Sequence, residues 1–296
     1  MTLPLADAII VCYGVSSVLP QCVEALLADP AVARVILVDN GNTCGQLSTL
    51  RLSLGDRVVV AGNGANIGFG AGVNLGARTS ASPCLLIVNP DCVVQPLAAS
   101  TLVHAMESHA GLSAAAGLLL NPDGTEQEGG RRTQPTLTHA IARRLRLHRL
   151  PVVGRSLDFN QSRSAVPIAP VEVEAVSGAF MLVTREAFDR VQGFDELFFL
   201  HFEDLDLCRR LREEAGPILF TPLAVAVHTK GESSAGVPLF VIWHKHRSFM
   251  LYRWKYARTV SDWLTLGLSG IGAAVSLALA TVVVVTRSTL SRLKPG

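Results

Sequence analysis

Three carboxylic acids, Glu203, Asp204 and Asp206, lie between the apolar run 197–202 and a basic helical stretch. An ionised carboxylate facing a cleft is the group that a general base requires. These acids begin the helix, and the helix dipole stabilises an anion at that end. A purely structural alternative is an N-cap that satisfies free backbone N–H groups. The residues alone leave both interpretations open.

Helical spacing places the acids on different faces of this helix. Asp204 shares its face with the residues at i+3, i+4 and i+7, which are Leu207, Cys208 and Leu211. Asp206 lies roughly 200° away at about 100° per residue. It can pair one turn on with Arg209 or Arg210. We therefore interpret Asp206 as part of a solvated face, and Asp204 as an inward carboxylate that must meet a cation, a donor or water.

Two further acids directly follow apolar strands. Asp39 ends the strand 35–38, and Asp91 follows the strand 84–88 in the turn Asn-Pro-Asp. Ligands of open α/β sheets bind outside the carboxyl ends of the strands. Each acid by itself is more typical of a turn than of a site. Together, with a glycine-rich loop between them, they favour a nucleotide-binding cleft.

That loop, residues 62–78, reads GNGANIGFGAGVNLGAR and enters a helix. A glycine loop after a strand, followed by Asp91 about twenty residues on, is similar to the dinucleotide-binding fingerprint. The third glycine, however, comes one position early, and the loop follows the third strand rather than the first. A dehydrogenase is therefore disfavoured.

His228 follows a short strand, residues 224–227, and precedes the polar loop 229–234. An isolated histidine is more often structural than a ligand. Its place at a strand end offers an alternative, because with Asp91 it could form an oxygen–nitrogen site for a divalent metal.

The elements that position these residues alternate between strand and helix. Apolar strands are expected at 8–12, 35–38, 58–61, 84–88, 114–120, 171–176, 179–183, 218–221 and 224–227. Helices are expected at 18–28, 96–109 and 186–191, besides those entered by the glycine loop and the acid cluster. This alternation predicts an α/β fold with a mostly parallel central sheet flanked by helices.

Composition narrows the class further. The net charge of +2 gives no support to nucleic-acid binding. The six cysteines show no CxxC and no Cys/His ligand spacing, so we expect reduced core residues of a cytoplasmic domain. The N-terminus lacks the features of a signal peptide, because its apolar run has only the length of a strand.

Basic and aromatic residues gather in two stretches. Residues 131–149 are strongly basic, which is typical either of a solvated helix or of a segment touching phosphates or anionic lipid. Residues 243–258 interleave aromatic and basic side chains, and residues 263–286 carry no charge over nearly the length of a bilayer span. We expect a catalytic domain at 1–242 and a membrane-associated flank with a C-terminal apolar helix at 243–296. That helix either spans the bilayer or lies on it, with the catalytic domain at the cytoplasmic face of the membrane.

The order of motifs resembles glycosyltransferase family 2, most closely its rhamnosyltransferase-like branch. The motifs are VDNGN (38–42), ANIGFGAGVN (65–74), NPD (89–91), SGAFMLV (177–183), GFDELFF (193–199), EDLDLCRR (203–210) and then His228. The resemblance covers about residues 8–256.

This resemblance implies a GT-A nucleotide-sugar-binding fold and an inverting, metal-dependent sugar transfer. It implies that Asp204 is the catalytic base with Glu203 beside it. Asp91 and His228 would hold Mg²⁺ or Mn²⁺, although Asn89 stands where the family's DxD motif has its first acid. The implied nucleotide-sugar contacts are Tyr13, Asp39, Asn66, Gly68, Asn89 and Asp91.

The implied reaction moves a sugar, expected to be L-rhamnose from dTDP-rhamnose, to a polyprenyl-diphosphate-linked or other growing surface glycan. Two alternatives remain. A nucleotidyltransferase would need a basic, glycine-rich loop near the N-terminus, and residues 13–17 contain one glycine and no lysine or arginine. The second is a non-catalytic membrane-associated scaffold that kept the nucleotide fold, which an absence of dTDP and Mg²⁺ binding in calorimetry would support.

Overall fold

The computed structural model describes residues 6–42, 45–136, 138–139, 142, 147, 150, 158–162, 164–229, 238–267 and 269–270. Within these residues, nine strands form one sheet in the order β3-β2-β1-β4-β10-β6-β11-β5, and β8 pairs with β11 outside that path. The strands are β1 (Ala6–Cys12), β2 (Val32–Asp39), β3 (Val58–Gly62), β4 (Cys84–Val88), β5 (Cys92–Val94), β6 (Ala114–Leu120), β8 (Val171–Val173), β10 (Phe180–Thr184) and β11 (Ile218–His228).

Six strands of this sheet run in one direction. Strands β3, β2, β1 and β4 pair in parallel, β10 is antiparallel to both β4 and β6, and β11 is parallel to β6. Only β10, β5 and β8 run the other way. The carboxyl ends of β1, β2, β4 and β11 therefore meet at one edge of the sheet, where ligands of such folds bind.

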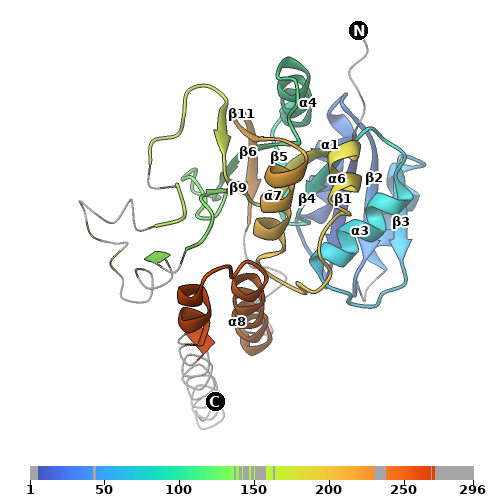
Figure 1. Ribbon diagram of the computed structural model, residues 1–296. Coiled ribbons are helices and arrows are strands. Elements are labelled where there is room, and N and C mark those ends of the chain that lie inside the picture. Colours follow the sequence, from blue (N-terminus) through green and yellow to red (C-terminus); the bar gives the residue numbers. More distant parts are fainter. Residues whose placement is uncertain are drawn as a thin grey trace, which may run out of the picture.

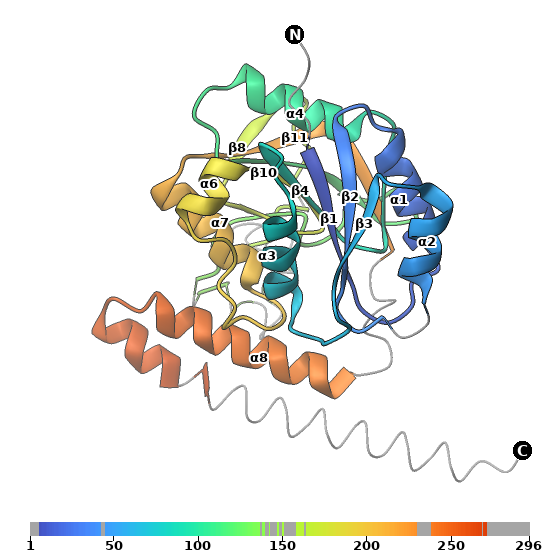
Figure 2. The same cartoon turned by 90° about the vertical axis from the view of Figure 1, so that its right-hand side faces the viewer.

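Helices cover both faces of the sheet (Figures 1 and 2). The first face packs against α1 (Leu19–Ala28), α2 (Gln46–Leu54) and α4 (Ala98–Ser108). The second face packs against α3 (Phe69–Thr79), α6 (Arg185–Arg190) and α7 (Glu203–Glu214). The strands between the two layers are apolar on both sides; every residue of β1 and β4 is buried. Burial on both faces explains why these strands read as continuous apolar runs.

Glycines in α3 and in the loop before it let their backbone lie close to neighbouring segments of the chain. At Gly68 the backbone has φ +89°, and a Cβ would stand 2.6 Å from the carbonyl oxygen of Phe199. At Gly76 a Cβ would stand 2.5 Å from Cγ2 of Ile9 in β1. The glycine-rich sequence therefore serves helix–sheet packing and a tight entry into α3.

A second, two-stranded sheet joins β7 (Arg131–Arg132) to β9 (Ala175–Val176). Helix α8 (Pro238–Lys255) spans the expected domain boundary between residues 242 and 243. It lies along the edge of the molecule toward which β1 and β4 run (Figure 2). Ser248 and Arg247 of α8 donate to the carbonyl oxygens of Leu200 and Leu197, so this helix braces the loop that leads into α7.

The predicted α/β class with a mostly parallel sheet and flanking helices is confirmed. The sequence analysis did not predict helices α2 and α8 or the short strands β5 and β7. Residues 218–221 and 224–227 are not separate strands: β11 is continuous, with a register shift between Thr221 and Val225. Residues 171–176 are divided between β8 and β9 of two different sheets.

Five described cysteines (Cys12, Cys22, Cys84, Cys92 and Cys208) are buried free thiols. The expected apolar helix at 263–286 lies mostly outside the described residues. Within the described part of the chain, every helix is too short or too polar to cross a bilayer.

Candidate active site

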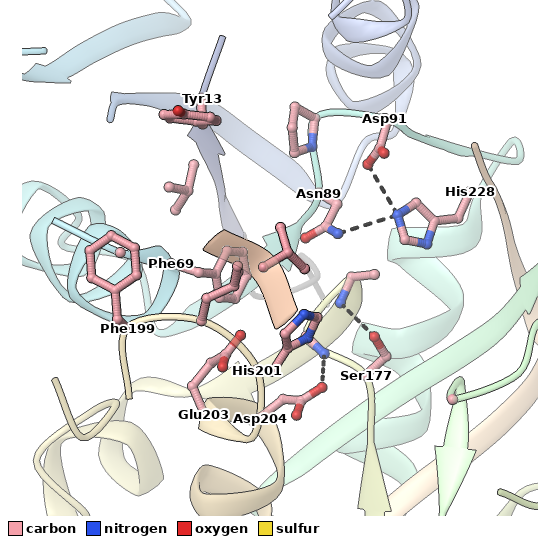
Figure 3. Close-up of a pocket in the computed structure, with 18 of the residues that line it drawn as sticks. Tyr13, Phe69, Asn89, Asp91, Ser177, Phe199, His201, Glu203, Asp204 and His228 are labelled. Atoms are coloured by element: carbon pink, nitrogen blue, oxygen red, sulfur yellow. Dashed lines mark hydrogen bonds and ion pairs between the residues drawn. The ribbon is translucent and has the colours of Figure 1, made fainter. Parts of the chain in front are cut away.

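A cavity of about 340 Å³ opens at the carboxyl edge of the sheet. Residues from seven segments line it: Val11 and Tyr13 at the end of β1, Asn40, Asn66 with Gly68 and Phe69, Asn89 to Asp91, Gln127 to Gly129 with Arg132, Ser177 to Ala179, and Phe199 to His201 with Glu203 and Asp204. His228 of β11 and Phe240 and Val241 of α8 complete the lining. Figure 3 shows Asp91 and His228 on one side of this space and Glu203 and Asp204 on another. The structure thus brings together acids and a histidine that are far apart in the sequence.

Asp91 and His228 form a buried pair. Nε2 of His228 lies 3.0 Å from Oδ1 of Asp91 and 3.3 Å from Nδ2 of Asn89. The pair exists because β5 and β11 are hydrogen-bonded, which sets Cys92 opposite His228 and places Asp91 at its side. Both side chains are about 7% exposed. Among the described residues, no group of three His, Cys, Asp or Glu side chains gathers to hold a metal.

The donor set of this pair nevertheless fits one divalent cation. A carboxylate oxygen and an imidazole nitrogen suit Mn²⁺. Adjacent ligands of an octahedral ion, with bonds of about 2.1 Å, stand about 3 Å apart, as these atoms do. Water and oxygens of a bound diphosphate would complete the coordination, which is the ordinary arrangement at phosphate-bound ions.

The backbone that leads into Glu203 and Asp204 is strained. His201 and Phe202 both adopt left-handed conformations, with φ +66° and +69°. Non-glycine residues in this region cost of order 1–3 kcal/mol each and gather at functional sites. The two residues turn the chain sharply, so that Glu203 and Asp204 enter the first turn of α7 beside the cavity. The N-cap is Phe202, which has no side-chain cap. Asp204 is therefore not at the N-cap position, although its Oδ1 accepts one free N–H of the first turn, that of Leu205.

Glu203 is buried, and its Oε2 atom has no hydrogen-bond partner. Burial, and after it the neighbouring charge of Asp204, raises the pKa of Glu203 to about 8. Glu203 is therefore largely protonated near neutral pH, and it lines the cavity as a neutral acid.

Asp204 meets the cation that its inward position requires. Nη2 of Arg132 lies 2.5 Å from Oδ2 of Asp204, and the backbone N–H of Leu205 donates to Oδ1 at 2.8 Å. Arg132 also donates to the carbonyl oxygen of Val176, which anchors the guanidinium. Alternation along β7 turns Arg131 toward Glu126 and Arg132 toward the cavity. Asp204 is thus held as an oriented carboxylate.

Asp206 is not on a solvated face, which corrects the expectation from helical spacing. Its carboxylate is fully buried, pairs with Arg210 at 2.8 Å as expected, and also contacts Lys255 at 2.7 Å. The hydroxyl of Tyr256 donates to it at 2.8 Å. The sequence of α7 could not indicate this burial, because the covering residues belong to α8 and its end.

The expected nucleotide contacts divide into two groups. Tyr13, Asn66, Gly68, Asn89 and Asp91 line the cavity. Asp39 does not; its Oδ1 accepts the backbone N–H groups of Gly41 and Asn42, as the turn-forming alternative predicted. The adjacent Asn40 lines the cavity instead. Asn40 donates to Asn66 at 3.2 Å and accepts from the N–H of Ile67 at 2.8 Å.

Sequence reasoning missed Asn40, Arg132 and Gln127 as cavity residues. Asn40 stands directly after Asp39, so the strand-end rule that singled out Asp39 could have found it. Arg132 was only one of several arginines in a basic stretch, and Asp204 lies 72 residues away. Gln127 follows a turn and carries no charge; no local signal marks it.

Comparison with solved structures defines the class to which this fold and site belong. The chain superposes on GalNAc-T7, crystallised with UDP, GalNAc and Mn²⁺, with a TM-score of 0.59 and 17% identity, over 83% of this chain and 47% of that one. It superposes on the mannosyltransferase PcManGT from Pyrobaculum calidifontis, in complex with GDP-Man and Mn²⁺, with a TM-score of 0.56 and 13% identity, over 99% of this chain and 81% of that one. The fold is that of GT-A glycosyltransferases.

Sequence comparison identifies the family. Residues 4–241 match the model of the glycosyltransferase-like family 2, and the chain belongs to that family. It is 29% identical over 239 residues to an N-acetylglucosaminyl-diphospho-decaprenol L-rhamnosyltransferase of Mycobacterium tuberculosis, with 76% of each chain covered. It is 25% identical over 231 residues to the rhamnosyltransferase WbbL of Escherichia coli, with 74% of this chain and 81% of that one covered. The predicted resemblance to rhamnosyltransferases of this family is confirmed.

Proposed function

We propose that this protein transfers L-rhamnose from dTDP-rhamnose to a polyprenyl-diphosphate-linked N-acetylglucosamine, with inversion at the anomeric carbon. The activity for which the Mycobacterium tuberculosis relative is named supports the sugar and the acceptor class. The observation that carries the proposal is the convergence of Asp91 and His228 with Glu203 and Asp204 on one cavity. An inverting transfer needs a charge-stabilising side for the leaving diphosphate and a base for the acceptor, and this cavity offers both.

On the acceptor side, Asp204 is the proposed base. The acceptor hydroxyl oxygen attacks the anomeric carbon, its proton passes to Asp204, and the bond from that carbon to the diphosphate oxygen breaks. Arg132 holds the carboxylate in place through the 2.5 Å contact, so it is a positioning residue for this step. Glu203 keeps its own proton and adds no second negative charge beside the acceptor.

On the donor side, Asp91 and His228 would hold a divalent cation. When bound, such an ion stabilises the negative charge that develops on the leaving diphosphate. The two residues orient the diphosphate end of the cavity, and their burial excludes water from it. Asn40, Asn66 and Tyr13 are positioned to contact the nucleoside.

The test compares Asp204→Asn with wild type, using dTDP-rhamnose, a short polyprenyl-diphospho-N-acetylglucosamine and Mg²⁺ or Mn²⁺. A general base contributes about 10²- to 10⁴-fold, so kcat should fall by that factor while dTDP affinity stays within about twofold. Asp206→Asn cannot serve as the control, because Asp206 is a buried ion-pair partner. Glu213→Gln, on the exposed side of the same helix, should leave kcat unchanged. Full turnover by Asp204→Asn would exclude Asp204 as the base.

A panel of nucleotide sugars tests the donor separately. Metal-dependent hydrolysis or thermal stabilisation should be greatest with dTDP-rhamnose. A preference for a UDP- or GDP-sugar would overturn the proposed donor while leaving the sugar-transfer reaction itself intact.

We also propose that the protein works at the cytoplasmic face of a membrane, where a polyprenyl acceptor resides. Support comes from three exposed indole rings on α8 and the following segment, those of Trp243, Trp254 and Trp263, each at least half exposed. Phe240 of the same helix lines the cavity, so this aromatic flank adjoins the site where the acceptor must enter. Tryptophan together with lysine and arginine is typical of the membrane interface.

A further inference from the structure

The ring of His228 is held from behind by an uncharged side chain with no role in the proposed reaction. Nδ1 of His228 lies 2.6 Å from Oε1 of Gln127, and Gln127 is only 5% exposed. Which ring nitrogen carries the hydrogen therefore depends on which end of the Gln127 amide faces the ring. A hydrogen-bond chain that starts at a carboxylate, together with the backbone carbonyl oxygen of His228, fixes that orientation.

The chain starts at Asp123, in the turn that follows β6. An ionised carboxylate can only accept hydrogen bonds. The hydroxyl of Thr125 lies 2.6 Å from Oδ1 of Asp123, so it donates its one hydrogen there. Hydrogen bonds from Thr125 hold the pKa of Asp123 below its ordinary value, which keeps this carboxylate ionised at neutral pH. Thr125 Oγ1 can then only accept from its next neighbour, Nδ2 of Asn121 at 2.9 Å.

The orientation of the Asn121 amide in turn determines that of the Gln127 amide. Because its NH₂ group faces Thr125, its Oδ1 faces Gln127 and accepts from Nε2 at 3.0 Å. The same Nε2 donates to the backbone carbonyl oxygen of His228 at 3.0 Å. Both hydrogens of the Gln127 amide are therefore engaged, and its carbonyl oxygen is the atom that faces His228.

A carbonyl oxygen accepts only, so Nδ1 of His228 must carry a hydrogen. In the neutral ring Nε2 then carries only a lone pair. The Asn89 amide, 3.3 Å away, can donate to it, whereas Oδ1 of Asp91 at 3.0 Å is a second acceptor, and two acceptors this close need a cation or a proton between them. Histidines that bind metals ordinarily have this form: one ring nitrogen donates its hydrogen to a carbonyl oxygen, and the lone pair of the other nitrogen binds the metal.

We propose that Gln127, oriented by the backbone carbonyl oxygen of His228 and by the hydrogen-bond chain from Asp123 through Thr125 and Asn121, sets the tautomer of His228 and leaves the lone pair of Nε2 for a cation shared with Asp91. This inference rests on the proposed function for the cation. The tautomer itself does not depend on it. Gln127 is a positioning residue: it contacts the histidine and acts through it.

The first measurement is the tautomer in the metal-free full-length protein. Long-range ¹H–¹⁵N correlation spectra of the histidine rings, recorded where imidazole is neutral, distinguish the two forms. The His228 signals are assigned from their loss in His228→Gln. The wild type should show hydrogen on Nδ1. A bare Nδ1, with hydrogen on Nε2 alone, would overturn the inference, whatever the protein's activity.

The second measurement is Mn²⁺ affinity, by electron paramagnetic resonance with and without dTDP. Loss of a partner behind a ligand histidine typically weakens metal binding about 10- to 100-fold, so Gln127→Leu should fall in that range. Gln127→Glu keeps an acceptor at Nδ1 and should bind more tightly than Gln127→Leu. Equal affinity of Gln127→Leu and wild type would contradict the proposal.

The far end of the chain supplies a matched pair away from the cavity. Thr125→Val removes the hydroxyl that orients Asn121, whereas Thr125→Ser keeps it. In both variants Nε2 of Gln127 still donates to the backbone carbonyl oxygen of His228, so both should keep hydrogen on Nδ1. A bare Nδ1 in Thr125→Val would contradict this role of the carbonyl oxygen. If the wild type has the expected tautomer but binds no Mn²⁺ even with dTDP, the metal role in the proposed function fails and the hydrogen-bond chain stands.

Discussion

At the residue scale, Glu203 and Asp204 are adjacent carboxyl groups that the structure treats differently. Asp204 is paired with Arg132, whereas Glu203 is buried and one of its carboxyl oxygens has no hydrogen-bond partner. Two neighbouring carboxyl groups whose environments push their pKa values apart are a recognised way to assign separate roles to them. This difference leads to two predictions about single side chains.

The first prediction concerns the pH dependence of stability. The pKa of Glu203 rises from 4.5 in the unfolded chain to about 8 in the folded protein. The contribution of Glu203 to the free energy of unfolding is therefore fully present below its pKa in the unfolded chain. It is lost as the pH rises through its pKa in the folded protein. Within this window the wild type should lose about 1.4 kcal/mol of unfolding free energy per pH unit from this group.

Glu203→Gln should remove that slope. Urea unfolding should give nearly equal stabilities for variant and wild type at about pH 5, and a more stable variant at about pH 8. The same difference at both pH values would mean that Glu203 is not protonated in the folded protein at neutral pH.

The second prediction concerns Arg132. Arg132→Met leaves Asp204 without its cation and its orientation, and a displacement of about 1 Å can cost about 100-fold in rate. We expect kcat to fall by about that factor while the KM for the nucleotide sugar changes little. A raised KM with unchanged kcat would instead place Arg132 in donor binding. Arg190→Met, which removes an exposed arginine from a surface pair, is the control.

At the element scale, α7 is held from two sides. Its inner face packs on the sheet, and Asp206 on another face is buried beneath Lys255 and Tyr256 at the end of α8. The loop between residues 195 and 202 lies between these helices, and Lys255 also pairs with Asp195 there at 2.6 Å. The position of the acid-bearing turn therefore depends on α8.

Asp206→Asn should destabilise the fold strongly, because removing one member of a buried ion pair costs about 3–5 kcal/mol. Glu213→Gln breaks the exposed Arg209–Glu213 pair of the same helix and should cost only about 0.5 kcal/mol. Chemical unfolding of both variants gives the comparison. Equal losses would show that α8 does not shield Asp206 from water.

Packing of α3 on β1 gives a second prediction at this scale. Gly76→Ala places a methyl group 2.5 Å from Cγ2 of Ile9, and overpacking of this kind costs about 1–3 kcal/mol. Gly267→Ala has no atom within 4 Å and should be neutral or stabilising, since alanine favours a helix over glycine by about 1 kcal/mol. Thermal unfolding of the two variants separates packing from helix propensity. No loss at Gly76 would contradict the close approach.

At the scale of the whole molecule, the catalytic cavity and the exposed aromatic flank lie on neighbouring surfaces. The strands deliver the cavity residues to one edge of the sheet, and α8 runs along that edge (Figure 2). This arrangement is the one that the proposed function requires, in which a lipid-linked acceptor reaches the cavity while its chain stays in a bilayer.

Replacing both Trp243 and Trp254 with serine should weaken binding of the full-length chain to anionic vesicles by at least about tenfold, because partial burial of two indole rings is worth about 2 kcal/mol. Leu223→Ser removes an apolar side chain that is 76% exposed on β11 and should leave vesicle binding unchanged. Co-sedimentation with vesicles measures both. Undiminished binding by the double variant would exclude the flank as the contact surface.

Local patterns in the sequence determined the strands, most helices and the strand-end residues of the site. Buried parallel strands are apolar throughout, so β4 and β6 could be predicted with their observed bounds. The carboxyl ends of such strands share one edge, which is why Asp91 and His228 could be expected to lie together. Asp204, at the start of a helix, was associated with them only by the family resemblance.

Only the tertiary structure decided the partners of those residues. Arg132 reaches Asp204 through β7 and its pairing with β9, Asp206 is buried by α8, and Gln127 reaches His228 from a turn about a hundred residues earlier. Periodicity reports which face of an element is apolar, but not what later covers that face. Charge pairing and hydrogen-bond direction depend on distances between segments remote in sequence, and these exist only once the chain has folded.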